Sequence, residues 1–260
     1  MRRYRFALGG VALAAAAAMA AGCSGTGTGS GSPSPGASAS AAARSATDEL
    51  VSAAGKLRSS TYKFTVKVGS TSMDGSADPS TKGVKLTSRA AAGGASVDIS
   101  LLAIGTDLYA QLTGLSMLGI NGDTWLHVDG TKIKSLALLG IADPSDPTGA
   151  NSLSKQIVSA SKSGSGEYTG TLDLTKAAVA GIPVAAITSM GDKAKAVPFT
   201  ASVDSQGRLT KESFTVPAQG SMPETPVTIT YSDFGSSVSI SKPTTNVQEA
   251  PQAVYTFLGG

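Results

Sequence analysis

The residue types that most often carry out chemistry are scarce in this sequence. Its 260 residues include a single cysteine, Cys23, and a single histidine, His127. One histidine cannot form a His-based metal cluster, and its alternation with Leu126 and Val128 beside Trp125 favours a surface or cross-strand position over a catalytic base. We therefore expect no metal, no cofactor and no catalytic residue.

Serine chemistry finds little support either. A G-x-S-x-G elbow is absent, and so are the S-D-N and K-T-G elements that accompany Ser-x-x-Lys in penicillin-binding enzymes. The Ser-x-x-Lys pattern itself is common in a chain rich in serine and lysine, and it occurs at Ser60/Lys63, Ser152/Lys155, Ser159/Lys162 and Ser239/Lys242. A cell-wall hydrolase or transferase is therefore the least favoured hypothesis, and we expect no enzyme.

The N-terminus has the pattern of an export signal. Arg2, Arg3 and Arg5 form a basic region, and the uncharged stretch 6–20 that follows is shorter than the roughly 20 residues of a membrane-spanning helix. Small residues then lead to Cys23, as at a signal-peptide cleavage site. The pattern predicts a signal peptide over residues 1–22 and a mature chain outside the cytoplasm.

The segment Ala20-Ala21-Gly22-Cys23 resembles the lipobox of bacterial lipoproteins, with Ala20 where that family usually has leucine. The resemblance implies that diacylglycerol alkylates the Cys23 thiol, which becomes the new N-terminus. Two acyl chains anchor a protein firmly, whereas one gives only marginal binding. We therefore expect Cys23 to anchor the protein on the extracytoplasmic face of the bacterial cell membrane; the alternative is an ordinary cleavage site with an incidental cysteine.

The charge of the mature chain is balanced. The whole chain has 21 Lys and Arg against 18 Asp and Glu, and the signal holds three Arg and no acid, so the mature protein has 18 of each. A nucleic-acid partner needs a basic surplus. We expect no nucleic-acid partner.

The domain organisation follows from composition. Residues 24–43 are all Gly, Ser, Thr, Ala or Pro, and such a segment buries too little apolar surface to offset its ordering entropy. Residues 23–43 are therefore predicted to be a lipidated cysteine and a flexible tether. Residues 44–260 are predicted to be one domain, because no Pro/Gly-rich break divides them.

In the first part of this domain the spacing of apolar residues changes once, from a helical period to strict alternation. Thr47 is a plausible cap for a helix that places Leu50, Val51, Ala54 and Leu57 roughly on one face. From Tyr62 to Val68 every second residue is apolar, which predicts a strand with one buried and one solvated face. The same alternation recurs in Val97–Leu101, Leu108–Leu112, Val197–Val203, Val227–Tyr231 and Val238–Ile240, with turns at Gly93-Gly94, Asp129-Gly130 and Gln206-Gly207.

The middle of the chain reads differently. We predict helices over 132–139 and 151–161 around a Pro-containing loop at Asp143–Pro147, and a third helical piece from Asp173 to Ala180. About six strands precede this block and about five follow it. Helices inserted between runs of strands predict an α+β fold with helices on one face of a large antiparallel sheet.

Several segments in this order resemble the mycobacterial and actinobacterial lipoprotein family that includes the lipid carriers LppX and LprG. They are 105–110 (GTDLYA), 125–129 (WLHVD), 168–173 (YTGTLD), 203–209 (VDSQGRL), 230–235 (TYSDFG) and 238–243 (VSISKP). The resemblance implies a large curved antiparallel half-barrel packed on helices, with an apolar cavity. It also implies binding of acylated lipids and glycolipids that are moved through the cell envelope.

Inward positions of the alternating strands are the candidates for lining such a cavity: Phe64, Val66, Val97, Ile99, Leu101, Leu108, Leu112, Leu126, Val128, Phe199 and Val203. Alternation alone proves that each strand has one apolar face. It does not distinguish a cavity from an ordinary filled core. With a hollow, the protein would carry lipids or glycolipids; with a filled core, it would be a membrane-tethered accessory protein whose envelope partner is unknown.

Two apolar runs are candidates for the cavity mouth. One is the Gly-punctuated segment 114–120 and the other is 136–141. The candidate mouth residues are Leu115, Met117, Leu118, Ile120, Lys132 and Lys134, where the lysines could attract an anionic head group. Alternatively, both runs cap the core and the lysines are simply solvated.

Overall fold

The computed structural model describes residues 35–92, 95–114, 122–133, 146–179, 182–220, 222–252 and 255. Within these ranges the side chains of 35–44, 90–92 and 95–97 are not described. Residues 35–260 form one compact unit, and all that follows concerns this unit.

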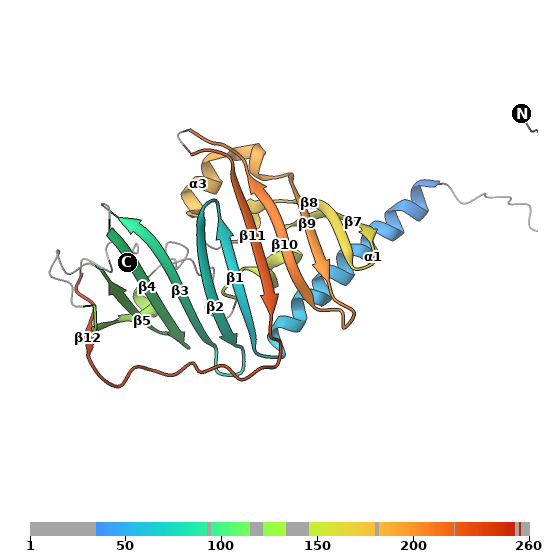
Figure 1. The fold of residues 1–260 in the computed structure, drawn as a ribbon. Helices are drawn as coiled ribbons and strands as arrows, with labels where there is room; N and C mark the ends of the chain where they lie inside the picture. Colours follow the sequence, from blue (N-terminus) through green and yellow to red (C-terminus); the bar gives the residue numbers. More distant parts are fainter. Residues whose placement is uncertain are drawn as a thin grey trace, which may run out of the picture. The chain divides into compact units, whose positions relative to one another are not determined.

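One curved, unclosed sheet dominates the described residues, and its twelve strands run in the order β12-β6-β5-β4-β3-β2-β1-β11-β10-β9-β8-β7 (Figure 1). Neighbours are antiparallel except β12 and β6, which are parallel. The strands are β1 (Tyr62–Val68), β2 (Thr71–Asp78), β3 (Gly83–Ala92), β4 (Ala95–Ile104), β5 (Asp107–Thr113), β6 (Trp125–Asp129), β7 (Ile157–Gly164), β8 (Glu167–Leu172), β9 (Val197–Val203), β10 (Leu209–Val216), β11 (Thr225–Ser232) and β12 (Val247–Glu249).

The helices of the described residues are few and mostly short. They are α1 (Pro35–Gly55), α2 (Leu153–Gln156) and α3 (Val184–Ser189), with 3₁₀ turns η1 (Lys56–Arg58), η3 (Gly130–Lys132), η5 (Ala150–Ser152), η6 (Leu174–Lys176) and η7 (Gly191–Ala194). A large antiparallel sheet with a few helices is an α+β half-barrel, so the predicted fold class is confirmed.

The sheet joins the two halves of the chain at its centre. β1 pairs with β2 on one side and with β11 on the other, so strands from both ends of the domain share one hydrophobic core. The two halves therefore belong to one sheet.

The long helix α1 covers one end of the sheet. Leu50, Ala53 and Ala54 of α1 are buried, which is the spacing of one helix face. With Leu57 of the following turn η1, they share the core with β1 side chains. Glu49 fixes the helix to β7 through an ion pair with Lys162 (2.8 Å) and to β8 through the Tyr168 hydroxyl. We call the sheet face that packs against α1 the inner face, and the opposite one the outer face.

The predicted start of this helix at Thr47 is wrong. α1 begins at Pro35, so residues 35–43, which were predicted to belong to the tether, have helical backbone. The physical reason is composition: proline is tolerated in the first helical turn, and the alanines that follow are the strongest helix formers.

The predicted helix 151–161 is wrong from Ile157 onward. Only Ala150–Gln156 is helical, and Ile157 begins the strand β7, which pairs with β8. The third predicted helix shrinks to the turn Leu174–Lys176, and a short helix forms at Val184–Ser189. Hairpin pairing with the adjacent strand β8 decided the conformation of Ile157–Gly164, and the apolar pattern of this segment alone does not contain that information.

Of the remaining predictions, some are confirmed and one strand is wrong. The strand Tyr62–Val68 is confirmed with both ends, and Gln206-Gly207 lies in the turn between β9 and β10. The strand predicted over Val238–Ile240 is wrong, because these residues form no ladder; the last strand among the described residues is Val247–Glu249. Gly93-Gly94 and most of the predicted helix 132–139 lie outside the described residues.

Candidate functional site

Strand register places the predicted cavity residues on the inner face. Phe64 and Val66 pair with Tyr231 and Ile229, and Leu108 pairs with Val128. Alternation along each strand then puts Ile99, Leu101, Leu112, Leu126, Phe199 and Val203 on the same side. Val97 has the same parity in β4 as Ile99, and its side chain lies outside the described set.

Burial divides these inner-face residues into two groups. Six are buried, namely Phe64, Val66, Leu101, Leu108, Val128 and Phe199. Ile99, Leu112, Leu126 and Val203 are only half-buried, as is Ala110. Because Ile99 pairs with Leu112 and Ala110 pairs with Leu126, these four residues form one contiguous apolar row across β4, β5 and β6. We call it the half-exposed row.

Within the described residues, two of the predicted cavity residues line pockets, and these two pockets are separate. Val203 contributes to an open pocket of about 880 Å³ that also touches α1 and β8. Phe199 contributes to another, of about 500 Å³, at β9, β10 and β11. These two pockets do not bring the predicted cavity residues together.

Most of the predicted mouth lies outside the described residues, including Leu115, Met117, Leu118, Ile120 and Lys134. Cys23 lies outside them as well.

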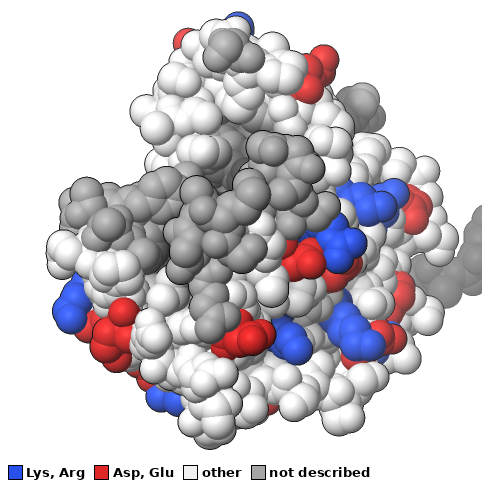
Figure 2. All heavy atoms as spheres, turned by 60° about the vertical axis from the view of Figure 1, so that its left-hand side comes forward, with Lys and Arg blue, Asp and Glu red and all other residues white. Residues whose placement is uncertain are grey.

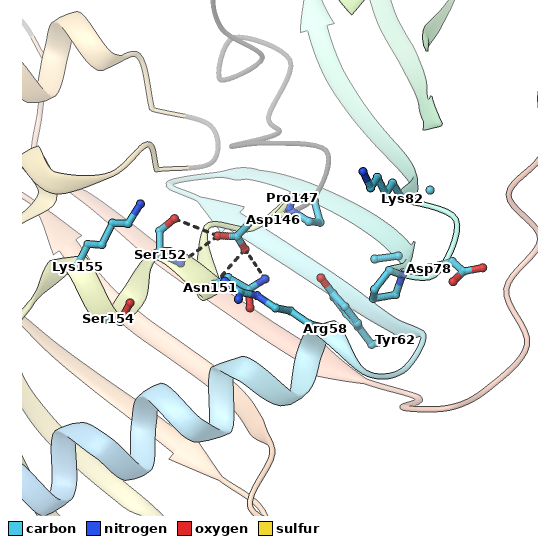
Figure 3. Close-up of a pocket in the computed structure, with 13 residues that line it drawn as sticks. Arg58, Tyr62, Asp78, Lys82, Asp146, Pro147, Asn151, Ser152, Ser154 and Lys155 are labelled. Atoms are coloured by element: carbon cyan, nitrogen blue, oxygen red, sulfur yellow. Dashed lines mark hydrogen bonds between the residues drawn. The ribbon is translucent and has the colours of Figure 1, made fainter. Parts of the chain in front are cut away.

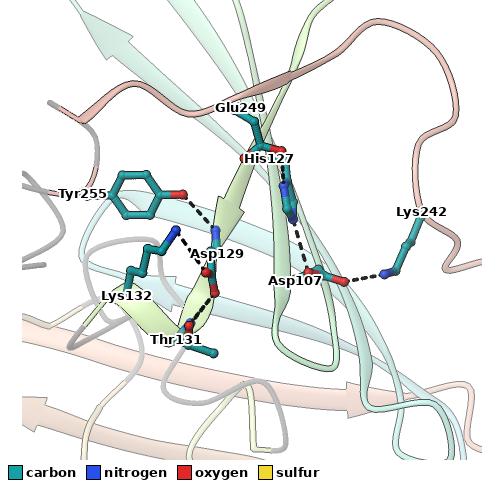
Figure 4. Close-up of polar contacts among 8 residues, drawn as sticks. All are labelled: Asp107, His127, Asp129, Thr131, Lys132, Lys242, Glu249 and Tyr255. Carbon is teal, nitrogen blue, oxygen red and sulfur yellow. Dashed lines mark hydrogen bonds and ion pairs between the residues drawn. The ribbon is translucent and has the colours of Figure 1, made fainter.

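Lys132 is the described member of the mouth set. Its ammonium lies 3.3 Å from an Asp129 carboxylate oxygen and 5.7 Å from the centre of the Tyr255 ring (Figure 4). Asp129 also accepts hydrogen bonds from the Thr131 backbone N–H (3.0 Å) and hydroxyl (2.6 Å), which fixes the turn η3. The Lys132 side chain remains largely exposed.

The structure reveals a buried acid that sequence analysis missed. Glu212 lies on the inner face between Ala201 of β9 and Ile229 of β11 and is 4% exposed. Burial, assisted by the charge of Asp146, raises the pKa of the Glu212 carboxyl to about 7. The sequence did contain a signal for this burial. Glu212, Phe214 and Val216 are alternate residues, so an acid stands at a position where the strand pattern predicts an inward side chain.

The loop before η5 is held by Asp146. One carboxylate oxygen accepts from the Asn151 backbone N–H (3.0 Å) and side-chain amide (3.2 Å). The other accepts from the Ser152 backbone N–H (3.0 Å) and hydroxyl (3.1 Å). Burial raises the pKa of the Asp146 carboxyl, and these hydrogen bonds oppose the shift. The Tyr231 hydroxyl also donates to Thr148 (3.0 Å), which ties the loop to the inner face.

A pocket of about 520 Å³ opens beside this loop (Figure 3). We call it the polar pocket. Its lining comes from η1, from the β2–β3 turn and from the segment Asp146–Lys155, and it comprises Arg58, Tyr62, Ala77, Asp78, Pro79, Lys82, Gly83, Asp146, Pro147, Asn151, Ser152, Ser154 and Lys155.

His127 occupies the cross-strand position that the sequence predicts. It pairs with Tyr109 and stacks on its ring, with centroids 5.0 Å apart. Its Nδ1 lies 2.8 Å from Glu249 and its Nε2 lies 3.2 Å from Asp107, which also bonds Lys242 (Figure 4). These contacts attach the C-terminal segment to β5 and β6, and they raise the pKa of the imidazole, chiefly through Glu249.

Within the described residues, no group of three or more His, Cys, Asp or Glu side chains is placed to hold a metal ion. No helix in the same part of the chain is long and apolar enough to cross a bilayer. On the face that Figure 2 shows, acidic and basic side chains lie beside one another without forming a patch of one sign. Comparison of the sequence with models of protein families and with curated proteins finds no match.

Proposed function

We propose that this protein is a membrane-anchored lipoprotein that binds acylated lipids or glycolipids and carries them in the cell envelope. The half-exposed row carries the proposal. Ile99, Leu112, Leu126 and Ala110 are apolar, contiguous and on the inner face, yet only half-buried. An apolar ligand lying on this row would remove its remaining exposed surface from water, which is favourable.

The energetics suit a carrier. Burial of a methylene group is worth about 0.8 kcal/mol, so an acyl chain of about 16 carbons has a gross transfer term of roughly 12 kcal/mol. A lipid leaves a membrane only if an apolar container replaces that burial. Such a container needs an apolar lining and polar groups near its opening, and it needs no reactive side chain.

Native mass spectrometry tests the proposal. The mature chain, produced from residue 23 with Cys23→Ser, carries no acyl group of its own, so any bound lipid is a ligand. We expect co-purified lipid that is lost when Leu112→Ser and Leu126→Ser are combined. The control is Val158→Ser, because Val158 is a large apolar residue that is 60% exposed in the edge strand β7. A lipid-free parent chain would contradict the proposal.

The second candidate function is a non-catalytic accessory protein with a filled core and an envelope partner. The observation in its favour is the complete burial of Phe64, Val66, Leu101, Leu108 and Val128. A lipid-free chain in the same experiment would support this alternative.

A further inference from the structure

We propose that the polar pocket binds an anionic, hydroxyl-bearing head group, of the phosphorylated-polyol class, belonging to the carried lipid. This inference rests on the proposed function and adds the chemistry of the ligand to it.

The cations of the pocket are the first argument. Arg58, Lys82 and Lys155 reach it from η1, from the β2–β3 turn and from α2 (Figure 3). In the part of the chain that the structure describes, none of the three forms an ion pair with a carboxylate. Three cations around one cavity favour an anion there, because charge-assisted hydrogen bonds to phosphate are strong.

The acids of the pocket, Asp78 and Asp146, are hydrogen-bonded within their own segments and make none of the ion pairs found among the described residues. Asp78 accepts from the Ser80 backbone N–H (3.0 Å) and hydroxyl (2.6 Å) within its own turn, and Figure 3 shows its carboxylate directed away from the pocket centre. Asp146 is saturated by its four hydrogen bonds to Asn151 and Ser152. The basic groups therefore remain available to a ligand.

An unsatisfied acceptor is the second, independent argument. The side-chain oxygen Oδ1 of Asn151 is buried and has no hydrogen-bond donor, while the amide nitrogen of the same side chain is committed to Asp146. A buried acceptor without a partner is costly. Phosphate oxygens cannot donate to it, whereas a polyol hydroxyl can, so the ligand should carry both groups.

Continuity with the inner face connects the pocket to a lipid. Tyr62 and Ala77 line the pocket and pair with each other across β1 and β2. The Tyr62 ring also lies 6.0 Å from the rings of Phe64 and Tyr231 on the inner face. One side of the pocket is thus polar and the other belongs to the apolar core, and this arrangement suits an amphiphile.

Calorimetry with short-chain lipids tests the inference on the unacylated mature chain. We expect dihexanoyl phosphatidylglycerol, which is anionic and has a free glycerol, to bind more tightly than dihexanoyl phosphatidylcholine or phosphatidic acid. The combined variant Arg58→Gln, Lys82→Gln and Lys155→Gln should weaken phosphatidylglycerol binding by about tenfold or more. All three side chains are exposed, so the folded state should survive; an unchanged circular dichroism spectrum checks this.

The matched control removes three charges elsewhere. Lys67, Lys193 and Lys211 are exposed, do not line the polar pocket, and should leave binding unchanged when replaced by glutamine. Equal losses in both triple variants, or no preference for phosphatidylglycerol, would overturn the inference. If glycerol phosphate bound as tightly as the lipid, the claim that the bound head group belongs to a lipid would be wrong.

Lipid co-purification separates this inference from the proposed function. If the pocket variant retains its co-purified lipid in full, the head-group assignment is wrong while lipid carriage stands. If the parent chain carries no lipid and binds no short-chain lipid, lipid carriage fails and the inference fails with it.

Discussion

Glu212 lies where its neighbours across the sheet, Ala201 and Ile229, offer only apolar side chains. Its pKa of about 7 lies above the value of 4.5 that applies to an exposed glutamate. The acid is therefore neutral in the folded state at pH values where the unfolded chain is already charged. Below pH 4.5 both states are protonated and Glu212 makes no pH-dependent contribution; between 4.5 and 7 its burial becomes progressively more costly.

The variant Glu212→Gln should consequently stabilise the protein at high pH and change little at low pH. At pH 8.5 we expect the free energy of unfolding to rise by about 3 kcal/mol, since one pKa unit corresponds to about 1.4 kcal/mol. Urea denaturation at pH 4.0 and pH 8.5 measures both values. The exposed Glu224 provides the control as Glu224→Gln, and an equal gain at both pH values would contradict the argument.

His127 has the opposite pH dependence. Its pKa is raised by Glu249 first and by Asp107 next, against burial. A base with a raised folded pKa contributes stability that is complete below the unfolded value near 6.5 and is lost as the pH rises through the folded value. His127→Gln should therefore lower the thermal midpoint more at pH 5.5 than at pH 8.5. A difference that is independent of pH would show that only the stacking on Tyr109 matters.

At the scale of elements, the β1–β2 hairpin requires a glycine at position 75, where there is no room for a side chain. A Cβ at Gly75 would lie 2.3 Å from the Phe64 ring, which crosses from the paired strand. Gly75→Ala should lower the free energy of unfolding by about 1 to 3 kcal/mol, which is typical of an overpacked core.

Gly55 provides the matched control for this substitution. A Cβ there meets nothing within 4 Å, and the residue ends α1 with helical backbone. Gly55→Ala should be neutral or stabilising by up to about 1 kcal/mol, because alanine favours a helix. Urea denaturation compares the two, and similar effects of both substitutions would refute the role given to Phe64.

The elements also show how far sequence patterns reach. Tyr62–Val68 was predictable because strict alternation is a local signal. The start of α1 was not, because a Pro/Gly/Ala/Ser run suits both a tether and a helix by composition. The polar pocket was unpredictable for another reason: Arg58, Lys82 and Asp146 are far apart in the chain, and only the sheet and the loop before η5 bring them together.

At the scale of the whole molecule, the proposed anchor makes a prediction about location. In a bacterial host that processes lipoproteins, the full chain should partition into the detergent phase of a Triton X-114 extract and should incorporate labelled palmitate. Cys23→Ser should abolish both, because it removes the only thiol in the chain and with it the acyl chains. If the Cys23→Ser protein still incorporated labelled palmitate, Cys23 would not be the site of lipid attachment.

If the chain is exported, as we propose, the parallel pairing of β12 with β6 has a consequence for the order in which strands can pair. When the mature part of a chain crosses the membrane from its N-terminal end, β6 emerges well before β12. The backbone N–H and C=O groups on the β12 side of β6 therefore stay unpaired until the C-terminal segment has crossed. During this interval the strand is a template for wrong partners. Nascent molecules that stall during translocation should therefore be the species most prone to self-association and proteolysis.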